Sequence, residues 1–341
     1  MNHSPRPTSG MPRSVVCFGE ALIDFLATGD DAPDRPRAFL QYAGGAPANA
    51  AAAVARLGGR AEFVGMLGAD MFGDFLLHSL DQAGVGTHYV RRTDAANTAL
   101  AFVSLDGHGE RSFSFYRPPA ADLLFTGADF DPECFAQAGV FHVCSNSLTD
   151  AGIAATTLEG MSRARTAGAI VSIDLNLRPA LWNADTDPLP RLWQALEAAD
   201  LVKLAGNELA WLAERQHDGA EGVTARLLQH ARLVVVTDGA APVRWQTRDA
   251  SGVSPTFQVR AVDTTAAGDA FIGGLLSELQ RHGVAGAELQ GFLHDHALLS
   301  ASLRYAAACG ALAVTRHGAL AALPTAHEVE ALLLRRESMP A

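Results

Sequence analysis

Residues 262–271 read Val-Asp-Thr-Thr-Ala-Ala-Gly-Asp-Ala-Phe, and they are the most informative stretch of this 341-residue chain. The small residues Ala266, Ala267 and Gly268 stand where a helix is predicted to begin, over 268–282. Free backbone N–H groups at a helix start point outward and carry the positive end of the helix dipole. Because so little side chain stands in the way, an anion can approach these groups closely. The stretch therefore predicts an anion hole.

Asp269 lies in the first turn of the same predicted helix. A carboxylate beside an anion hole suits a general base that takes a proton from an attacking hydroxyl during phosphoryl transfer. The alternative is structural: Asp263 or Thr264 caps the helix, and Asp269 only complements its dipole. Taken alone, this stretch leaves the two interpretations equally open.

Two further segments carry residues suited to sugar recognition. Gly44 and Gly45 let the backbone approach a ligand, and Asn49 offers both a donor and an acceptor. Asp24 follows the first predicted strand, at the carboxyl edge where open α/β sheets bind ligands. A plain Gly-rich turn before an Ala-rich helix is the alternative interpretation of the glycines.

Short apolar runs alternate with longer segments of helical period along most of the chain. The predicted strands are 15–18, 63–64, 140–143, 170–174, 201–203 and 233–237. The predicted helices are 47–57, 72–83, 151–167, 189–199, 207–215, 222–230, 268–282, 296–313 and 326–336. Such alternation predicts an α/β fold in which helices cover both faces of a mostly parallel sheet.

Two segments break this alternation, at about 29–43 and 98–117. The first is charged and contains two prolines, and the second reads as two strands around an Asp-Gly turn. We expect them to pair as a small β-sheet that acts as a lid, although a surface hairpin without a role is also open. The chain is predicted to form one domain over 14–336 that includes these two lid insertions, with a disordered tail at 1–13 and a C-terminal tail at 337–341.

Composition excludes several classes of function. The chain is 48% hydrophobic and 18% charged with a net charge of −11, which argues against nucleic acid as the main partner. No apolar run is long enough to span a bilayer, so no membrane partner is expected. The four scattered cysteines are predicted to be reduced thiols in a cytoplasmic protein. The absence of Gly-x-Gly-x-x-Gly after the first strand argues against a dinucleotide-dependent oxidoreductase.

Together these motifs resemble the ribokinase-like, or PfkB-type, carbohydrate kinases. Residues 44–49 and 263–269 are similar to the two signatures of that family, and the second is the more specific. Segments 65–73, 174–178 and 313–319 resemble further family elements in the right order. The resemblance covers about 15–324 and implies a ribokinase-like three-layer α/β/α domain with a small β-sheet lid.

The resemblance also implies roles for individual residues. Asp269 would be the base, and the backbone of Ala266, Ala267 and Gly268 the anion hole. The sugar would be held by Asp24, Gly44, Gly45, Asn49, Arg178 and Arg117. ATP would be contacted by Lys203, Glu208, Thr237, Gly239, Thr265 and Gly268, with Glu208 supporting Mg²⁺ through water. A monovalent cation such as K⁺ would lie among Asp263, Thr265, Arg316 and Gly318.

Three positions depart from the family pattern, and at one of them Ala266 replaces a Gly, where a small side chain should be tolerated. Ala205 stands where the Mg²⁺ motif commonly has Asn, and Pro242 stands where the ATP loop usually has a second Gly. The Ala205 departure bears on how Mg²⁺ is held, and the Pro242 departure bears on which phosphate of ATP is contacted.

Residues 115–124 look most like the fructokinase branch. The resemblance then implies ATP-dependent conversion of D-fructose to fructose 6-phosphate by a homodimer joined through the lid. The alternatives are a 2-keto-3-deoxygluconate kinase, whose substrate carboxylate could meet Arg117 or Arg178, and a ribokinase. A non-catalytic sugar or nucleotide sensor is the alternative of another class.

Overall fold

The structure is a computed structural model that describes residues 13–28, 36–105 and 111–337. Its main body is built on a nine-stranded sheet of order β13-β12-β11-β10-β9-β8-β1-β4-β5. The strands are β1 Ser14–Phe18, β4 Ala61–Gly68, β5 Val90–Thr93, β8 Ala138–Cys144, β9 Ile170–Asp174, β10 Leu201–Ala205, β11 Leu233–Asp238, β12 Ala241–Gln246 and β13 Ser251–Ser254. All pairings from β5 to β11 are parallel, and β12 and β13 add antiparallel strands at one edge. The predicted mostly parallel sheet is confirmed.

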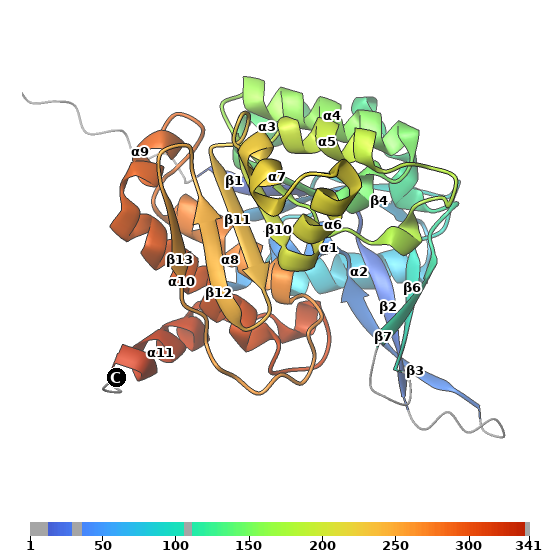
Figure 1. The fold of residues 1–341 in the computed structure, drawn as a ribbon. Helices are drawn as coiled ribbons and strands as arrows, with labels where there is room; N and C mark the ends of the chain where they lie inside the picture. The colour runs from blue at the N-terminus through green and yellow to red at the C-terminus, as the bar shows by residue number, and fades with distance from the viewer. Residues whose placement is uncertain (1–12, 29–35, 106–110, 338–341) are drawn as a thin grey trace, which may run out of the picture.

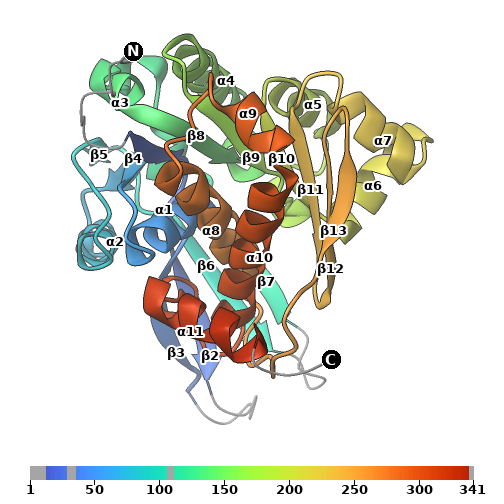
Figure 2. The ribbon, with the colours of Figure 1, turned by 90° about the vertical axis from the view of Figure 1, so that its left-hand side faces the viewer.

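Helices cover both faces of this sheet (Figures 1 and 2). One face carries α1 Ala46–Arg56, α2 Met71–Gln82, α8 Ala267–Arg281, α9 Leu289–His294, α10 His296–Ala313 and α11 Ala326–Glu337. The other carries α3 Pro132–Ala136, α4 Ala151–Thr166, α5 Leu189–Glu197, α6 Gly206–Gln216 and α7 Ala220–Leu227. Successive β1 residues divide between the two cores: Val15 and Cys17 face one, Val16 and Phe18 the other. Burial on both faces explains why the strands read as continuous apolar runs.

Close packing of small residues brings the starts of α1 and α8 together. A side chain at Gly273 of α8 would collide with Ala53 of α1, so the two backbones approach more closely than larger residues would allow. Buried alanines fill the rest of that face of α1. The Ala-rich sequence of α1 thereby places Asn49 beside the first turn of α8.

A separate four-stranded sheet projects from the main body (Figure 1). Its strands are β2 Leu22–Thr28, β3 Ala38–Gly44, β6 Leu100–Leu105 and β7 Arg111–Tyr116, in the order β3-β2-β6-β7. The predicted small sheet and its β6–β7 hairpin are confirmed, while the turn at 106–110 and the segment 29–35 lie outside the described residues. We call these four strands the lid sheet.

One detail of the lid prediction is wrong. The described part of the 29–43 segment, residues 36–43, does not pair with the hairpin, because β2 lies between β3 and β6 and runs parallel to β6. Asp24 therefore belongs to the lid sheet and not to the edge of the main sheet. The mostly apolar run Leu-Ile-Asp-Phe-Leu-Ala-Thr gives β2 no clear alternation, so its separate identity is hidden in the sequence.

The predicted tails fall almost wholly outside the described residues. Short 3₁₀ turns at Ala121–Leu124, Gly127–Asp129, Ser145–Leu148, Pro179–Leu181 and Leu320–Ala322 complete the connections. Within the described part of the chain, no helix combines the length and apolar character needed to cross a membrane.

Candidate functional site

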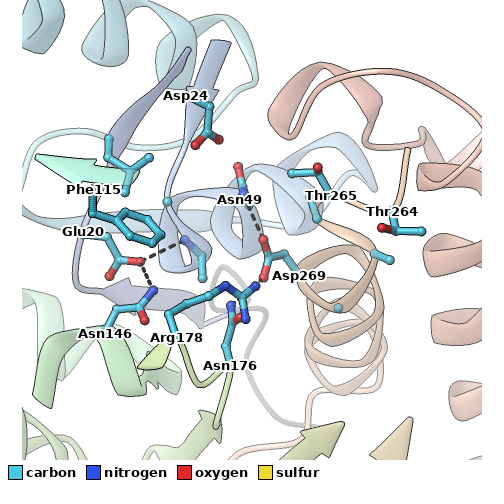
Figure 3. A pocket seen from close by; sticks show the side chains of 16 residues that line it. Glu20, Asp24, Asn49, Phe115, Asn146, Asn176, Arg178, Thr264, Thr265 and Asp269 are labelled. Carbon is cyan, nitrogen blue, oxygen red and sulfur yellow. Dashed lines mark hydrogen bonds between the residues drawn. The ribbon is translucent and has the colours of Figure 1, made fainter. Parts of the chain in front are cut away.

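A cavity of about 330 Å³ lies between the lid sheet and the main body. This volume is in the range of small-molecule sites. Its lining residues come from six segments of the chain (Figure 3): Glu20, Leu22, Asp24, Gly45, Ala46, Asn49, Phe115, Asn146, Asn176, Arg178, Thr264, Thr265, Ala266, Ala267, Gly268 and Asp269. The predicted anion hole, the predicted base and most predicted sugar contacts thus share one cavity.

The loop before α8 has the conformation of an anion-binding turn. Ala266 is the N-cap residue with a left-handed backbone, φ 59° and ψ 11°, and α8 begins at Ala267. No side chain caps this helix start, residues 266–268 line the cavity, and the Ala267 N–H makes a long 3.4 Å hydrogen bond to the Thr264 carbonyl. The backbone of 266–268 therefore presents donors and the positive end of the α8 dipole to a ligand.

Asp263 anchors this loop from below. Its buried carboxylate accepts the Thr265 N–H at 2.7 Å and the Gly318 N–H at 3.0 Å. Three of the four residues predicted around a monovalent cation are thus gathered. The side chain of the fourth, Arg316, pairs with Glu328, so only its backbone remains for that role.

Gly268 is required by a cation that lies beside it. A Cβ at this position would come within 2.8 Å of the Lys203 ammonium nitrogen. Lys203 is buried and donates a 2.8 Å hydrogen bond to Asp174. Burial lowers the pKa of Lys203, but the charges of Asp174 and Glu208 raise it by more, so the net shift is upward and the cation is stable. A positive charge is therefore fixed next to the anion hole.

Asp269 is held by two amide groups. Its Oδ2 accepts from the Asn49 side chain at 2.9 Å, and its Oδ1 accepts from the Asn176 side chain at 3.2 Å (Figure 3). Burial raises the pKa of Asp269 to about 6, although the Asn49 hydrogen bond and the charges of Lys203 and Arg178 oppose the shift. The carboxylate is thus ionised at neutral pH yet able to accept a proton.

Glycines make room for the acceptors on the opposite wall. A side chain at Gly44 would collide with the Asp24 carboxylate, which lines the cavity. Gly44 itself is not among the described lining residues, so its part is to admit Asp24. Gly45, which does line the cavity, has φ 103°, a conformation that favours glycine.

The floor of the cavity contains two residues that no sequence motif singles out for binding, Glu20 and Asn146. Glu20 is buried and accepts from the Asn146 side chain at 2.8 Å and from the Ala46 N–H at 3.1 Å. Burial raises the pKa of Glu20, and the charge of Arg117 partly offsets it. Only the tertiary structure brings these residues together, because 126 positions separate Glu20 from Asn146.

Arg117 is the predicted sugar contact that the structure places elsewhere. Its buried guanidinium donates to Asp122 at 2.6 and 2.8 Å and to the Asn146 carbonyl at 2.7 Å. It is not among the described residues that line the cavity. Arg117 instead supplies the charge behind Glu20, and Arg178 is the arginine on the cavity wall.

Two of the predicted nucleotide contacts, Thr265 and Gly268, line the cavity, whereas Lys203, Glu208, Thr237 and Gly239 lie near the carboxyl ends of β10 and β11. Ala205 pairs with Thr237 across these strands, and Gly239 forms the following turn with φ 51°. The Glu208 carboxylate faces inward, where it accepts the Leu177 and Ala205 N–H groups, each at 2.7 Å. The four residues near the strand ends lie along the same sheet edge as the cavity but are not among its described lining residues.

Comparison with known proteins gives one consistent result. Residues 12–326 match the model of a family described as "pfkB family carbohydrate kinase". A probable fructokinase-4 of Arabidopsis thaliana is 40% identical over 330 residues, which cover 96% of this chain and 98% of that relative.

Two solved structures extend the comparison. A fructokinase of Xylella fastidiosa with bound ATP superposes with a TM-score of 0.92 at 54% identity, covering 96% of this chain and 100% of that chain. A double mutant of the fructokinase of Vibrio cholerae O395, bound to fructose, ADP and potassium, superposes with a TM-score of 0.84 at 32% identity and the same coverage.

The buried charge of Asp269 predicts a stability effect. The pKa of Asp269 is raised from its ordinary 3.8 to about 6, so its contribution to stability is present below pH 4 and is lost as the pH rises through 6. Replacing Asp269 with Asn removes that loss. We expect the unfolding free energy of Asp269→Asn, relative to the unsubstituted protein, to grow by about 1.4 kcal/mol between pH 5 and pH 8.

Urea unfolding at the two pH values measures this difference. Asp185→Asn, at an exposed loop position, is the matched control and should show no such growth. A pH-independent difference for Asp269→Asn would show that this carboxylate carries no raised pKa.

Proposed function

This chain belongs to the pfkB family of carbohydrate kinases, and from that premise we propose that it transfers the γ-phosphoryl group of ATP to D-fructose, giving fructose 6-phosphate. The single observation that carries the mechanism is the position of Asp269. An ionisable carboxylate held by two amides stands next to an anion hole, inside a cavity large enough for a sugar. The relatives named above as fructokinases support fructose as the acceptor.

The proposed chemistry uses groups already in place. Asp269 takes the proton from the attacking sugar hydroxyl, whose oxygen forms a bond to the γ-phosphorus. The bond between that phosphorus and the β–γ bridging oxygen breaks, and ADP leaves. The N–H groups of 266–268, with the Lys203 cation beside them, stabilise the negative charge on the phosphoryl group in transit.

The charge of the cavity favours a neutral sugar over a sugar acid. Among the described lining residues, Glu20, Asp24 and Asp269 carry carboxyl groups, and Arg178 carries the only guanidinium. A substrate carboxylate would meet like charges at close range, which disfavours its binding. Sugar hydroxyls, in contrast, can donate to these acceptors. The cavity therefore supports fructose over 2-keto-3-deoxygluconate.

The residues present also fit the expected cofactors. We place ATP along the edge formed by Lys203, Thr237, Thr265 and Gly239, and a K⁺-type cation at the loop that Asp263 anchors. The bound ATP, ADP and potassium named for the two solved structures support these assignments. Each oxygen of Glu208 accepts one backbone N–H group and keeps one lone pair, with which Glu208 would hold Mg²⁺ through a water molecule. Bound Mg²⁺ would neutralise phosphate charge.

The lid sheet supports a homodimer. Phe25, Phe39, Phe102 and Tyr116 form a cluster of ring contacts across its four strands. Two residues of this cluster are exposed, Phe39 by 36% and Tyr116 by 67%. Exposed apolar side chains gathered on one element are typical of an interface between subunits. We also propose a cytoplasmic location, which the four buried free cysteines support.

A substrate panel tests the proposed acceptor. With Mg-ATP and a coupled assay for ADP, we expect kcat/KM for fructose to exceed that for 2-keto-3-deoxygluconate by roughly 10²-fold or more, the cost of an unfavourable buried charge contact. Ribose is assayed as a further acceptor, and the fructose assay is repeated in K⁺-free buffer. Preference for the sugar acid, or ADP release that Asp269→Asn leaves unchanged, would contradict the proposal.

Gly268→Ala tests the anion hole. The new Cβ would press on the Lys203 ammonium, which Asp174 holds, and would disturb the adjacent N–H groups. We expect kcat to fall roughly 10²-fold, the usual loss for one oxyanion donor, with little change in KM for fructose. Gly291→Ala on α9, where an added Cβ meets open space, is the control. Equal turnover in both variants would remove the loop from the mechanism.

Tyr116→Lys tests the lid interface. We expect the unsubstituted protein to be a dimer by light scattering after size exclusion, and Tyr116→Lys to shift it toward monomer, because a charge would be buried at the interface. Val253→Lys, at a position 68% exposed on β13, introduces the same charge on the main body as a control. A monomeric unsubstituted protein would refute the proposed dimer.

A further inference from the structure

The segment 174–178, at the carboxyl end of β9, is tied to its surroundings at nearly every residue. Asp174 pairs with Lys203, and the Leu175 N–H donates to the Lys203 carbonyl at 3.0 Å. The Leu177 N–H donates to Glu208 at 2.7 Å. Between these fixed points the Asn176 side chain reaches across to Asp269, as Figure 3 shows.

Asn176 adopts a backbone conformation that costs free energy. Its φ is 39°, one of three positive values among the non-glycine residues that the structure describes. Asn tolerates this region better than most residues, but glycine would adopt it without strain. A strained residue persists where its surroundings impose it, and such residues gather at functional sites. The carboxylate of Glu208 imposes it here, because it fixes the N–H of the next residue.

We propose that Asn176 and Glu208 form one positioning unit for the base Asp269, in which Glu208 fixes the backbone turn and Asn176 passes that constraint on through its amide. The inference rests on the proposed function, in which Asp269 accepts the hydroxyl proton. Neither residue is a catalytic residue in this assignment. Asn176 contacts the base, and Glu208 acts through the backbone of Leu177.

The unit joins the two halves of the site. Glu208 belongs to the first turn of α6, and it also accepts the N–H of Ala205, which pairs with Thr237 at the expected nucleotide edge. Asn176 lines the cavity on the sugar side. A displacement of the β10–α6 connection would thus move Leu177, Asn176 and the base together. We infer that the arrangement of the nucleotide half sets the orientation of the base in the sugar half.

The proton affinity of Asp269 reports on this unit, because a hydrogen bond to the charged form lowers the pKa of a carboxyl group. Other charges also bear on Asp269, and they must stay constant in any test. The ionisable groups that face it or share its cavity wall are Asp174, Lys203, Arg178, Cys144, Glu20 and Asp24. None of these six is altered in the variants below, and the charge that Glu208→Gln removes beside Asp174 and Lys203 would by itself lower the pKa of Asp269, opposite to the rise expected from a lost hydrogen bond.

Asn176→Gly and Glu208→Gln test the inference. Asn176→Gly keeps the left-handed turn open to the backbone and removes only the amide. Glu208→Gln presents an NH₂ group to one of the two N–H groups that the carboxylate now accepts. We expect each variant to raise the acid limb of the kcat/KM profile for fructose by about one pH unit, since a hydrogen bond to a charged group is lost or misaligned. KM for fructose should change less than about threefold.

The double variant separates a shared unit from independent roles. If the two residues act together, kcat/KM of the double variant Asn176→Gly with Glu208→Gln should be no lower than that of the more impaired single variant. If their roles are independent, the two fold-losses in kcat/KM should multiply. A Glu208 that acts only through Mg²⁺ would instead raise the Mg²⁺ requirement and leave the acid limb in place. Glu214→Gln, an exposed position on α6, is the control.

A readout that does not need turnover completes the test. The pH dependence of the unfolding free energy, compared with and without Asp269→Asn in each background, reports the pKa of Asp269 directly. We expect that pKa to rise in Asn176→Gly and in Glu208→Gln. If the pKa of Asp269 is unshifted in both variants while Asp269→Asn is inactive, the positioning unit alone is overturned. If Asp269→Asn is active, the proposed function is overturned.

Discussion

The site depends on keeping one carboxylate ionised where water cannot solvate it. Burial alone would hold Asp269 in its protonated form, which cannot act as a base. The Asn49 amide and the charges of Lys203 and Arg178 keep it ionised near neutral pH, Asn176 donates a second hydrogen bond, and these groups come from distant parts of the chain. Asn49 requires the start of α1 at this point, and Asn176 requires the end of β9. The contact between Ala53 and Gly273 is what lets α1 and α8 approach closely enough.

Charge balance beneath the anion hole follows from the same constraint. Asp174, Glu208 and Asp269 are all buried within one region, and Lys203 is the cation among them. Three carboxylates without that ammonium would repel one another and take up protons. Lys203 needs space beside the loop that we propose binds phosphate, and the missing side chain of Gly268 provides it. The glycine of the signature thus serves the buried ion pair as well as the approaching anion.

Local rules explain which parts of the structure the sequence predicts. The anion hole, Asp269 and Asn49 follow from the chemistry of helix starts, and the six predicted strands follow from unbroken apolar runs. The floor of the cavity has no such signal, because Glu20 meets Asn146 only through the order of strands in the sheet. Arg117 illustrates the limit: the sequence places an arginine near the sugar, but Asp122, five residues away, already holds it in the core. The strand β2 is hidden for a related reason, since its lid residues continue the apolar character of β1.

The polarity of the cavity walls supplies the orientation that chemistry at Asp269 requires. One wall, formed by Glu20 and Asp24, offers carboxyl acceptors, which favour groups that donate hydrogens. The facing wall offers backbone N–H groups at the start of α8 together with Arg178, and both favour phosphate. In the reversed orientation, the phosphate would face the carboxylates of Glu20 and Asp24, and the sugar hydroxyls would face the N–H donors at the start of α8. Asp269 lies where the two walls meet, so a correctly oriented pair brings a hydroxyl and a phosphoryl group to the same carboxylate.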